Sequence, residues 1–163
     1  MNRRTLLLGG LAVAGLAAAS SETVRTVVLG HVQDGVSRVT PNNTVVSTNI
    51  THMGMIRDND PGQDALHRAS GTVTVADNKI QLGEDFTSTP GPDYHVYISS
   101  TLDIVDEATF EAARPVELGR LKRGNGASVY DLIPLMDAPD NFSVTIWCKR
   151  FGEFIGSANV SRL

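Results

Sequence analysis

The sequence lacks a second cysteine. Cys148 is the only one among 163 residues, so no disulfide can form within the chain. Motifs that bind metals or activate nucleophiles are also missing: there is no C-x-x-C, H-x-x-x-H, H-E-x-x-H or G-x-S-x-G pattern. The C-x-x-C-H pattern is absent too, which excludes covalent attachment of a c-type haem. Short motifs therefore give no support to a metalloprotease, a serine hydrolase or a c-type cytochrome.

An excess of basic residues is missing as well. The chain has 14 Lys and Arg against 18 Asp and Glu. Residues 1–19 hold two of the basic residues, Arg3 and Arg4, and none of the acidic ones, so the remainder carries 12 basic and 18 acidic residues and a net charge of −6. Nucleic-acid-binding domains favour a basic patch or stripe. We therefore expect no nucleic-acid partner.

Residues 1–19 have the pattern of an export signal. The basic segment MNRR precedes the apolar run TLLLGGLAVAGLA, and Ala17 and Ala19 supply the small residues for cleavage before Ser20. The apolar run is short for a membrane span. The sequence therefore predicts an exported protein, periplasmic, extracellular or at the cell surface, that contacts a membrane only if this segment is retained.

The export route is left open by the residues around the basic pair. Arg3 and Arg4, directly before the apolar run, favour a twin-arginine signal, whereas Asn2 and Leu6 depart from its usual pattern. The general secretory route is the alternative. No cysteine follows the apolar run, which argues against a bacterial lipoprotein anchor. Either route leads to an oxidising compartment, where a lone cysteine is unusual.

The chain divides into a signal segment at 1–19, a linker at 20–53 rich in Ser, Thr, Asn and Val, and a domain at 54–163. The linker either tethers the domain or adds an edge strand to it. In the domain, short alternating segments between turn residues predict strands. These strands are SGTVTVAD and NKIQLG, which would form a hairpin, then YHVYISS, VELGRL, SVYDLIP, FSVTIWCKRF and EFIGSANV. One short helix is expected near residues 104–114. The predicted fold class is all-β, an antiparallel β-sandwich or barrel of about seven to nine strands with that one helix.

Strand alternation assigns a direction to Cys148. In FSVTIWCK, the face with Val144, Ile146 and Cys148 is apolar, whereas Trp147 and Lys149 lie on the opposite, mixed face. We therefore expect the thiol to point into the core or into a pocket in it. A free cysteine often does no more than fill space in a core. The alternative is a redox thiol or a ligand, because an idle thiol outside the cell is prone to oxidation.

Neighbouring residues bear on this second interpretation. Positive charge beside a thiol favours the reactive thiolate, and Lys149 and Arg150 follow the cysteine directly. In YHVYISS, alternation puts His95 and Tyr97 on the face opposite the apolar one. If that strand pairs with FSVTIWCK, these two side chains would lie beside Trp147. The same alternation places His95 across the sheet from the thiol, so a direct contact between them would need a bulge.

Four blocks of the sequence carry a resemblance to a known family: ALHRASGTVTV, LGEDFTSTPGPDYHVYIS, VELGRLKRGNGASVYDLIP and FSVTIWCKRFGEFIGSANV. In this order, over residues 54–161, they resemble the DM-thirteen domain, which is proposed to act in electron transfer and occurs alone or next to DOMON-type haem or sugar modules. The family's V-I-W-C-basic pattern falls on Ile146, Trp147, Cys148 and Lys149. Its G-P-D-aromatic-x-V-Y block falls on Gly91, Pro92, Asp93, Tyr94, Val96 and Tyr97.

The resemblance implies a redox role for Cys148, as a naked thiol or as the ligand of a prosthetic group such as non-covalent haem. Trp147 would then shield the site or provide a stacking surface, and Lys149 and Arg150 would tune its charge. His95 is a candidate partner or co-ligand of the thiol, and Asp93 most simply caps the turn. Copper is less expected, because neither His nor Met follows the cysteine to complete a blue-copper ligand set.

Two functions from different classes remain. The first is an exported, non-enzymatic redox or electron-transfer module in which Cys148 is the redox thiol or a cofactor ligand and the partner is an electron-transfer protein. The second is a non-catalytic cell-surface binding or adhesion module with a structural, buried Cys148. Reaction of the thiol in the folded protein, or the absorbance band of a cofactor, would favour the first function.

Overall fold

The computed structural model describes residues 38–39, 45–46, 49–132 and 138–163. The expected export signal and most of the expected linker lie outside these residues. Before residue 49, the short strands β1 (Arg38–Val39) and β2 (Val45–Val46) pair antiparallel with each other. Within the described residues, no helix is both long and apolar enough to cross a membrane.

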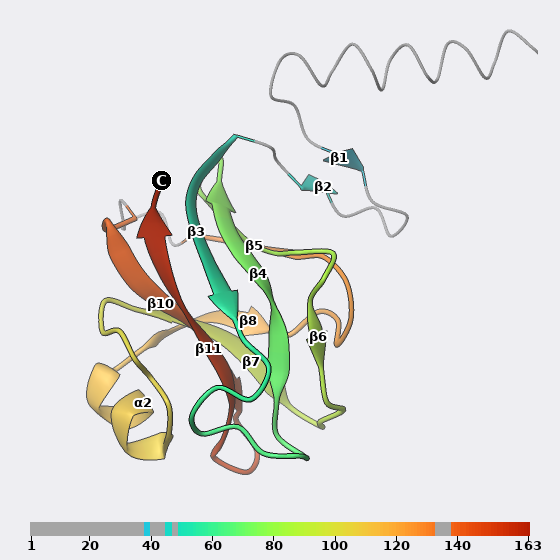
Figure 1. Ribbon diagram of the computed structural model, residues 1–163, viewed down its shortest axis with the longest axis vertical. Helices are drawn as coiled ribbons and strands as arrows, with labels where there is room; N and C mark the ends of the chain where they lie inside the picture. Colours follow the sequence, from blue (N-terminus) through green and yellow to red (C-terminus); the bar gives the residue numbers. More distant parts are fainter. Residues whose placement is uncertain (1–37, 40–44, 47–48, 133–137) are drawn as a thin grey trace, which may run out of the picture. The chain divides into compact units, whose positions relative to one another are not determined.

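An antiparallel sheet of nine strands makes up the domain (Figure 1). Eight of them pair in the order β8-β7-β10-β11-β3-β4-β5-β9, and the short β6 pairs with β4. Their bounds are β3 Ile50–Ile56, β4 Ala69–Ala76, β5 Lys79–Leu82, β6 Thr87–Ser88, β7 Tyr94–Ser99, β8 Val116–Arg120, β9 Ser128–Asp131, β10 Asn141–Cys148 and β11 Glu153–Arg162. The two ends of the order, β8 and β9, come into contact, so the sheet curls into a nearly closed barrel. This confirms the predicted all-β fold and selects the barrel.

The predicted hairpin is formed by β4 and β5. Its two-residue turn consists of Asp77 and Asn78, with φ angles of 50° and 58°. Positive φ at both central residues is typical of the type I′ turn, whose twist matches that of the flanking strands. Asp and Asn tolerate this conformation better than other non-glycine residues, which explains why the turn forms at this point of the sequence.

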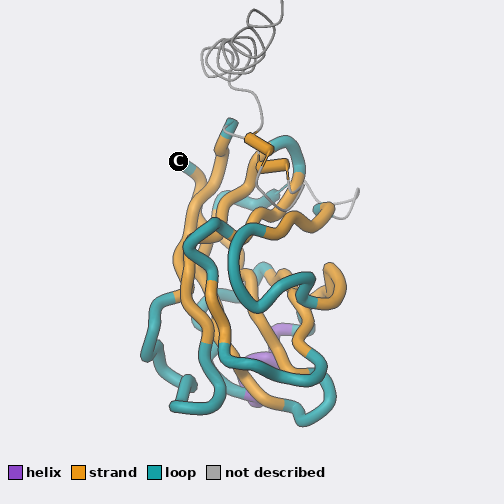
Figure 2. Tube along the Cα trace, turned by 90° about the vertical axis from the view of Figure 1, so that its right-hand side faces the viewer, coloured by secondary structure: helices purple, strands orange, loops and turns teal. Residues whose placement is uncertain are grey.

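The helix α2 (Glu107–Ala113) lies within the predicted range of residues 104–114. Asp106 caps its N-terminus: the Asp106 carboxylate accepts a hydrogen bond from the backbone N–H of Thr109, and Thr109 Oγ1 accepts one from the backbone N–H of Asp106. Arg114 ends the helix in the left-handed conformation, with φ of 46°. Figure 2 shows α2, in purple, near the lower end of the domain in that view.

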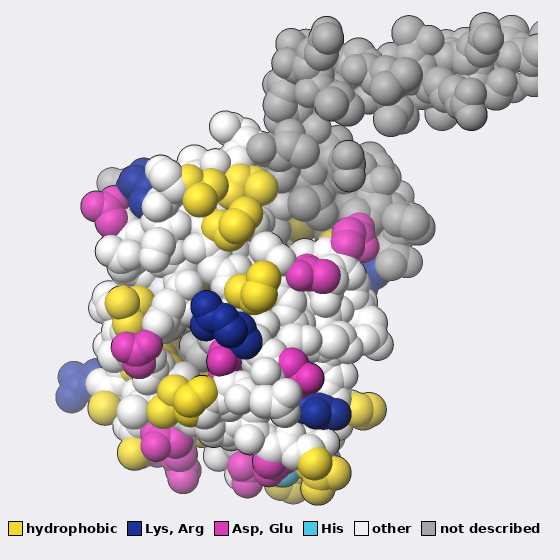
Figure 3. All heavy atoms as spheres, in the orientation of Figure 1, with side chains coloured by type: hydrophobic (Ala, Val, Ile, Leu, Met, Phe, Trp, Pro, Cys, Tyr) yellow, Lys and Arg dark blue, Asp and Glu magenta, His cyan; other side chains and the backbone are white. Residues whose placement is uncertain are grey.

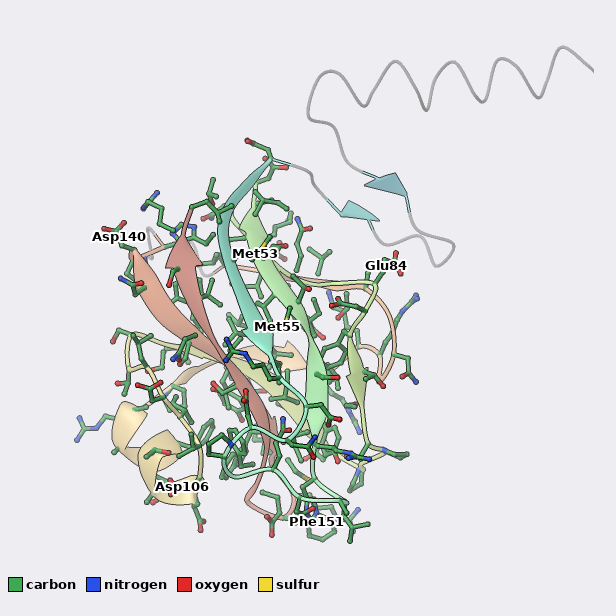
Figure 4. The ribbon with its side chains drawn as sticks, in the orientation of Figure 1. Met53, Met55, Glu84, Asp106, Asp140 and Phe151 are labelled. Carbon is green, nitrogen blue, oxygen red and sulfur yellow. The ribbon has the colours of Figure 1, made fainter. Side chains whose placement is uncertain are left out.

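The sheet begins before the expected domain boundary. β3 starts at Ile50 and pairs with β4 and β11, so residues 50–53 lie in the sheet rather than in a linker. His52 is buried, whereas Met53 and Met55 are exposed; Figure 4 labels the two methionines. Apolar side chains gather over β3 on the face shown in Figure 3. A buried histidine and exposed methionines invert the usual apolar alternation, which is why the pattern concealed this strand.

Two clusters of buried side chains lie on the two faces of the sheet. The larger cluster fills the barrel and includes Tyr94, Val96, Ile98, Val144, Ile146 and Cys148. The smaller cluster consists of Tyr97, Ile104, Trp147 and Phe154, packed against Phe110 and Ala113 of α2. The helix therefore covers the outer face of β7 and β10, which the sequence shows as a mixed face.

Candidate functional site

Strands β7 and β10 lie side by side and bring the candidate residues together. Cα partners in this antiparallel pair are Trp147 with His95 and Cys148 with Tyr94. Cys148 and Tyr94 both belong to the cluster inside the barrel, whereas Trp147 and Tyr97 belong to the outer cluster. This confirms the opposite directions that alternation assigned to the thiol and the indole, and the expected placement of Trp147 beside the strand of His95.

The Cys148 side chain is enclosed by the barrel. It is 2% exposed and lies in the main core. Within the described residues, the thiol has no hydrogen-bond partner. Reactions in which sulfur itself forms a bond to another molecule require access, which this position denies. Outer-sphere electron transfer needs no such contact and remains compatible with the burial.

The turn before β7 packs on Tyr94, the strand partner of Cys148. A Cβ atom added to Gly91 would lie 2.0 Å from Cζ of Tyr94, so the absence of a side chain there lets the turn pack on the tyrosine ring. The Tyr94 hydroxyl donates a hydrogen bond to the backbone oxygen of Pro90 (3.4 Å). The backbone N–H of Lys149 donates to the backbone oxygen of Asp93 (3.0 Å) and ties the end of β10 to the turn. The G-P-D block thus acts as a lid over the residue that pairs with Cys148.

Aromatic rings connect the outer face of β10 with that of β7. The Trp147 indole, 6% exposed, stacks on Phe110 with ring centroids 4.1 Å apart and planes inclined by 2°. Phe110 in turn meets Tyr97 edge to face, with centroids 5.0 Å apart and planes at 88°. Both geometries are favourable for aromatic pairs. The three rings form a continuous contact beneath helix α2.

Charged side chains continue this contact to the surface. The Tyr97 hydroxyl donates to Oε2 of Glu117 at 3.5 Å, and Nζ of Lys149 donates to the same oxygen at 2.9 Å. Oε1 of Glu117 lies 2.6 Å from Nδ1 of His95, and Nε2 of His95 lies 3.0 Å from Oδ1 of Asp93. Glu117, the second residue of β8, is therefore the centre of a polar network that reaches the phenol.

These contacts shift the acidity of the network. The hydrogen bond from Lys149 lowers the pKa of Glu117, and the hydrogen bond from His95 lowers it further. The pKa of Asp93 is lowered mainly by its hydrogen bond from His95. Burial, and then the negative charge of Glu117, raise the pKa of Tyr97. The network therefore places an ionised carboxylate beside a phenol that keeps its proton.

Four of the six candidate residues meet in the polar network around Glu117: Lys149, His95, Asp93 and Tyr97. Trp147 lies in the outer cluster together with Tyr97. Cys148 stays on the other face. Both ring nitrogens of His95 contact carboxylates, so the structure places this histidine away from the thiol. Arg150 lies over the exposed ring of Phe151, at 5.7 Å.

Phe110 and Glu117 were not among the sequence candidates. Phe110 was concealed because a seven-residue helix shows too little periodicity to reveal which face it buries. Glu117 looked like an ordinary polar residue of the VELGRL strand. Its position opposite Tyr97 in the β7–β8 register brings it into the polar network, and that register includes a bulge between Val96 and Tyr97.

A comparison with known protein families tests the resemblance to the DM-thirteen domain. A family model described as "Electron transfer DM13" matches residues 62–160. The chain belongs to the DM13 family. No curated protein and no solved structure matches it. The family description assigns this DM13 domain to electron transfer in general, and the matched range includes every residue of the network above.

A haem at Cys148 does not fit this DM13 domain. Among the described residues, Cys148 does not line the surface hollows of about 530, 310 and 240 Å³. An iron ligand must face a cavity that admits the macrocycle, whereas core side chains enclose this thiol. In the part of the chain that the structure describes, no group of three His, Cys, Asp or Glu side chains is placed to hold a metal ion such as copper. The described residues therefore offer neither a haem site at Cys148 nor a metal site of three such side chains.

Proposed function

We propose that this DM13 domain is an exported one-electron-transfer module, in which Trp147 carries an electron between the buried Cys148 and the outer face of the barrel. Export rests on the signal pattern of residues 1–19. The partner is an electron-transfer protein met outside the cell or at its surface.

The observation that carries this proposal is the arrangement of two consecutive residues on β10. Cys148 points into the barrel and Trp147 points out of it, so a single residue step crosses the wall of the sheet. Both are oxidisable side chains, and the indole continues into ring contacts that lead away from the barrel. An electron can thus leave the interior although the sulfur is closed to other molecules.

A second function is favoured by one observation. Cys148 is buried without a hydrogen-bond partner among the described residues, which is also what a purely structural cysteine would show. In that case the domain is a non-catalytic binding or adhesion module. The two functions differ in what happens to Cys148 when the intact, folded protein meets a one-electron oxidant.

Photogenerated tris(bipyridine)ruthenium(III), a one-electron oxidant that does not bond to sulfur, tests the proposal. The measured quantity is the thiol that remains titratable after denaturation. We expect the wild-type protein to lose its thiol and Trp147→Phe to keep most of it over the same exposure, because the route across the sheet is interrupted. Equal thiol loss in the two proteins, or none in either, would leave the binding module as the better function.

Two controls accompany this experiment. Phe151→Leu removes an aromatic ring from the exposed turn and should leave the rate of thiol loss unchanged. An absorbance spectrum of the protein exported by its native host should show no haem band. A haem band would contradict transfer through the naked thiol.

A further inference from the structure

We infer that Tyr97 is the outer terminus of this relay and that Glu117 takes its phenolic proton when the electron leaves. The inference rests on the proposed function, because it names the side chain at which the relay meets its partner. It assigns a redox role to a tyrosine and a base role to a glutamate that packing and charge pairing alone would not require.

The position of Tyr97 suits a terminus. Its ring is joined to Trp147 through Phe110, with centroid distances of 5.0 and 4.1 Å along the way. Its side chain is 8% exposed, so it lies just beneath the surface, and its hydroxyl reaches the charged network outside. Beyond Trp147, it is therefore the next oxidisable side chain of the outer cluster.

A buried phenol can give up an electron readily only if its proton leaves at the same time, because the oxidised phenol would otherwise hold a positive charge in an apolar setting. Oε2 of Glu117 is the acceptor, 3.5 Å from the hydroxyl oxygen. Contacts to the base are often longer at rest than in the reacting complex. Lys149, at 2.9 Å, and His95, at 2.6 Å, hold the carboxylate in place.

The charged groups around this phenol come from its own strand, β7, and from the two neighbouring strands, β8 and β10. Asp93 and His95 are contributed by β7 and the turn before it, Glu117 and Arg120 by β8, and Lys149 by the end of β10. Helix α2 contributes Phe110 and Ala113 to the cluster. Of these groups, Glu117 is the one whose carboxylate contacts the Tyr97 hydroxyl.

Tyr97 loses one electron to a one-electron acceptor, its O–H bond breaks, and the proton passes to Glu117, which leaves a neutral phenoxyl radical and a neutral carboxylic acid. Trp147 then returns one electron to the phenoxyl, and the proton returns from Glu117 to the phenol oxygen. The indole radical cation that remains takes one electron from Cys148, whose S–H bond breaks. The thiol proton is released to solvent, and a neutral thiyl radical and a neutral indole remain.

Flash photolysis with the same ruthenium(III) complex tests the inference on the full folded domain. In the wild type, a phenoxyl signal should rise as ruthenium(III) is consumed, and it should slow in deuterated water. Tyr97→Phe, which keeps the ring, should abolish this signal and slow the loss of the Cys148 thiol. Glu117→Gln should slow phenoxyl formation by about a hundredfold, which is the ordinary contribution of a positioned base.

The matched control is Glu111→Gln, which removes the same charge from an exposed position on helix α2 and should leave the rate unchanged. Urea unfolding of each variant confirms that it is folded. A wild-type phenoxyl rate equal to that of Glu117→Gln would overturn the role of Glu117, and thiol loss that is unchanged in Tyr97→Phe would overturn the role of Tyr97. In both cases slow thiol loss in Trp147→Phe would still support the proposed function, so the two failures are distinguishable.

Discussion

The indole of Trp147 lies flat on the ring of Phe110, with centroids 4.1 Å apart. This pair attaches helix α2 to the barrel, because Phe110 and Ala113 are the helix residues that pack on the outer cluster. Trp147 is also the only tryptophan of the chain. Its fluorescence therefore reports directly on the attachment of the helix.

Phe110→Ala should loosen the helix. The substitution removes both ring contacts, and because Phe110 is only partly buried we expect the free energy of unfolding to fall by about 2 kcal/mol, less than for a fully buried phenylalanine. Trp147 emission should shift to longer wavelength as water reaches the indole. Urea unfolding followed by fluorescence measures both effects.

Phe151→Ala is the control for this prediction. Phe151 is 63% exposed on the turn after β10 (Figure 4), and its loss should change the unfolding free energy by less than about 0.5 kcal/mol. A Phe110→Ala protein that matches this control in stability and emission would show that the stack does not hold the helix.

Substitutions of Cys148 should reveal how closed the interior is. Cys148→Ala should cost about 1–2 kcal/mol of unfolding free energy, because it leaves a small cavity. Cys148→Ser should cost more, about 2–3 kcal/mol, because its hydroxyl is buried without a partner among the described residues. In the wild type, a thiol label should react only at the rate of unfolding. Rapid labelling of the folded protein would mean that the thiol is open to solvent.

Gly91→Ala should open the lid beside the thiol. The added methyl group would lie 2.0 Å from the Tyr94 ring, so the ring or the turn must move, at a cost of about 1–3 kcal/mol. We expect faster labelling of Cys148 in this variant. In the control Gly124→Ala, the new Cβ would meet only Ser88 Oγ at 3.4 Å, and neither stability nor labelling should change.

Acid should weaken the domain partly through Glu117. The pKa of Glu117 in the folded protein lies below the usual value of 4.5, which applies to the unfolded chain. The ionised carboxylate therefore stabilises the fold at pH values above 4.5. This stabilisation is lost as the pH falls through the lower pKa of the folded protein. The side chain is 34% exposed, so the contribution is below about 1 kcal/mol. Glu117→Gln should be slightly less stable at pH 7 and show a flatter decline below about pH 4.5 in urea unfolding. Equal slopes for the two proteins would contradict this assignment.

Period-two alternation was enough to predict much of this domain. It gave the opposite directions of Trp147 and Cys148 and the shared face of His95 and Tyr97, because side-chain direction in a strand depends only on local geometry. Turn chemistry gave the β4–β5 hairpin for the same reason. These features need no knowledge of distant residues.

Long-range pairing lay beyond the sequence. Nothing local indicates that Glu117 would meet His95 and Tyr97, since that contact depends on which strands become neighbours and in which register. The cover that Phe110 gives to Trp147 likewise depends on where helix α2 docks. In the sequence this face of β10 is only a mixed one, although Trp147 is buried there in the structure.

The pairing of β10 with β11 contains a bulge, which shows how one extra residue changes the positions of the residues after it. Ile146 is paired with Gly156 but Trp147 with Phe154, so Ile155 is one residue more than the ladder needs. Whether the tryptophan or the cysteine of the W-C pair enters the barrel depends on whether the number of preceding strand residues is odd or even. Deleting one residue of β10 before Trp147 would put the cysteine at the outward position now held by Trp147 and the tryptophan at the inward position now held by Ile146. The chemistry of this strand thus depends on the position of each residue along the strand as well as on its identity.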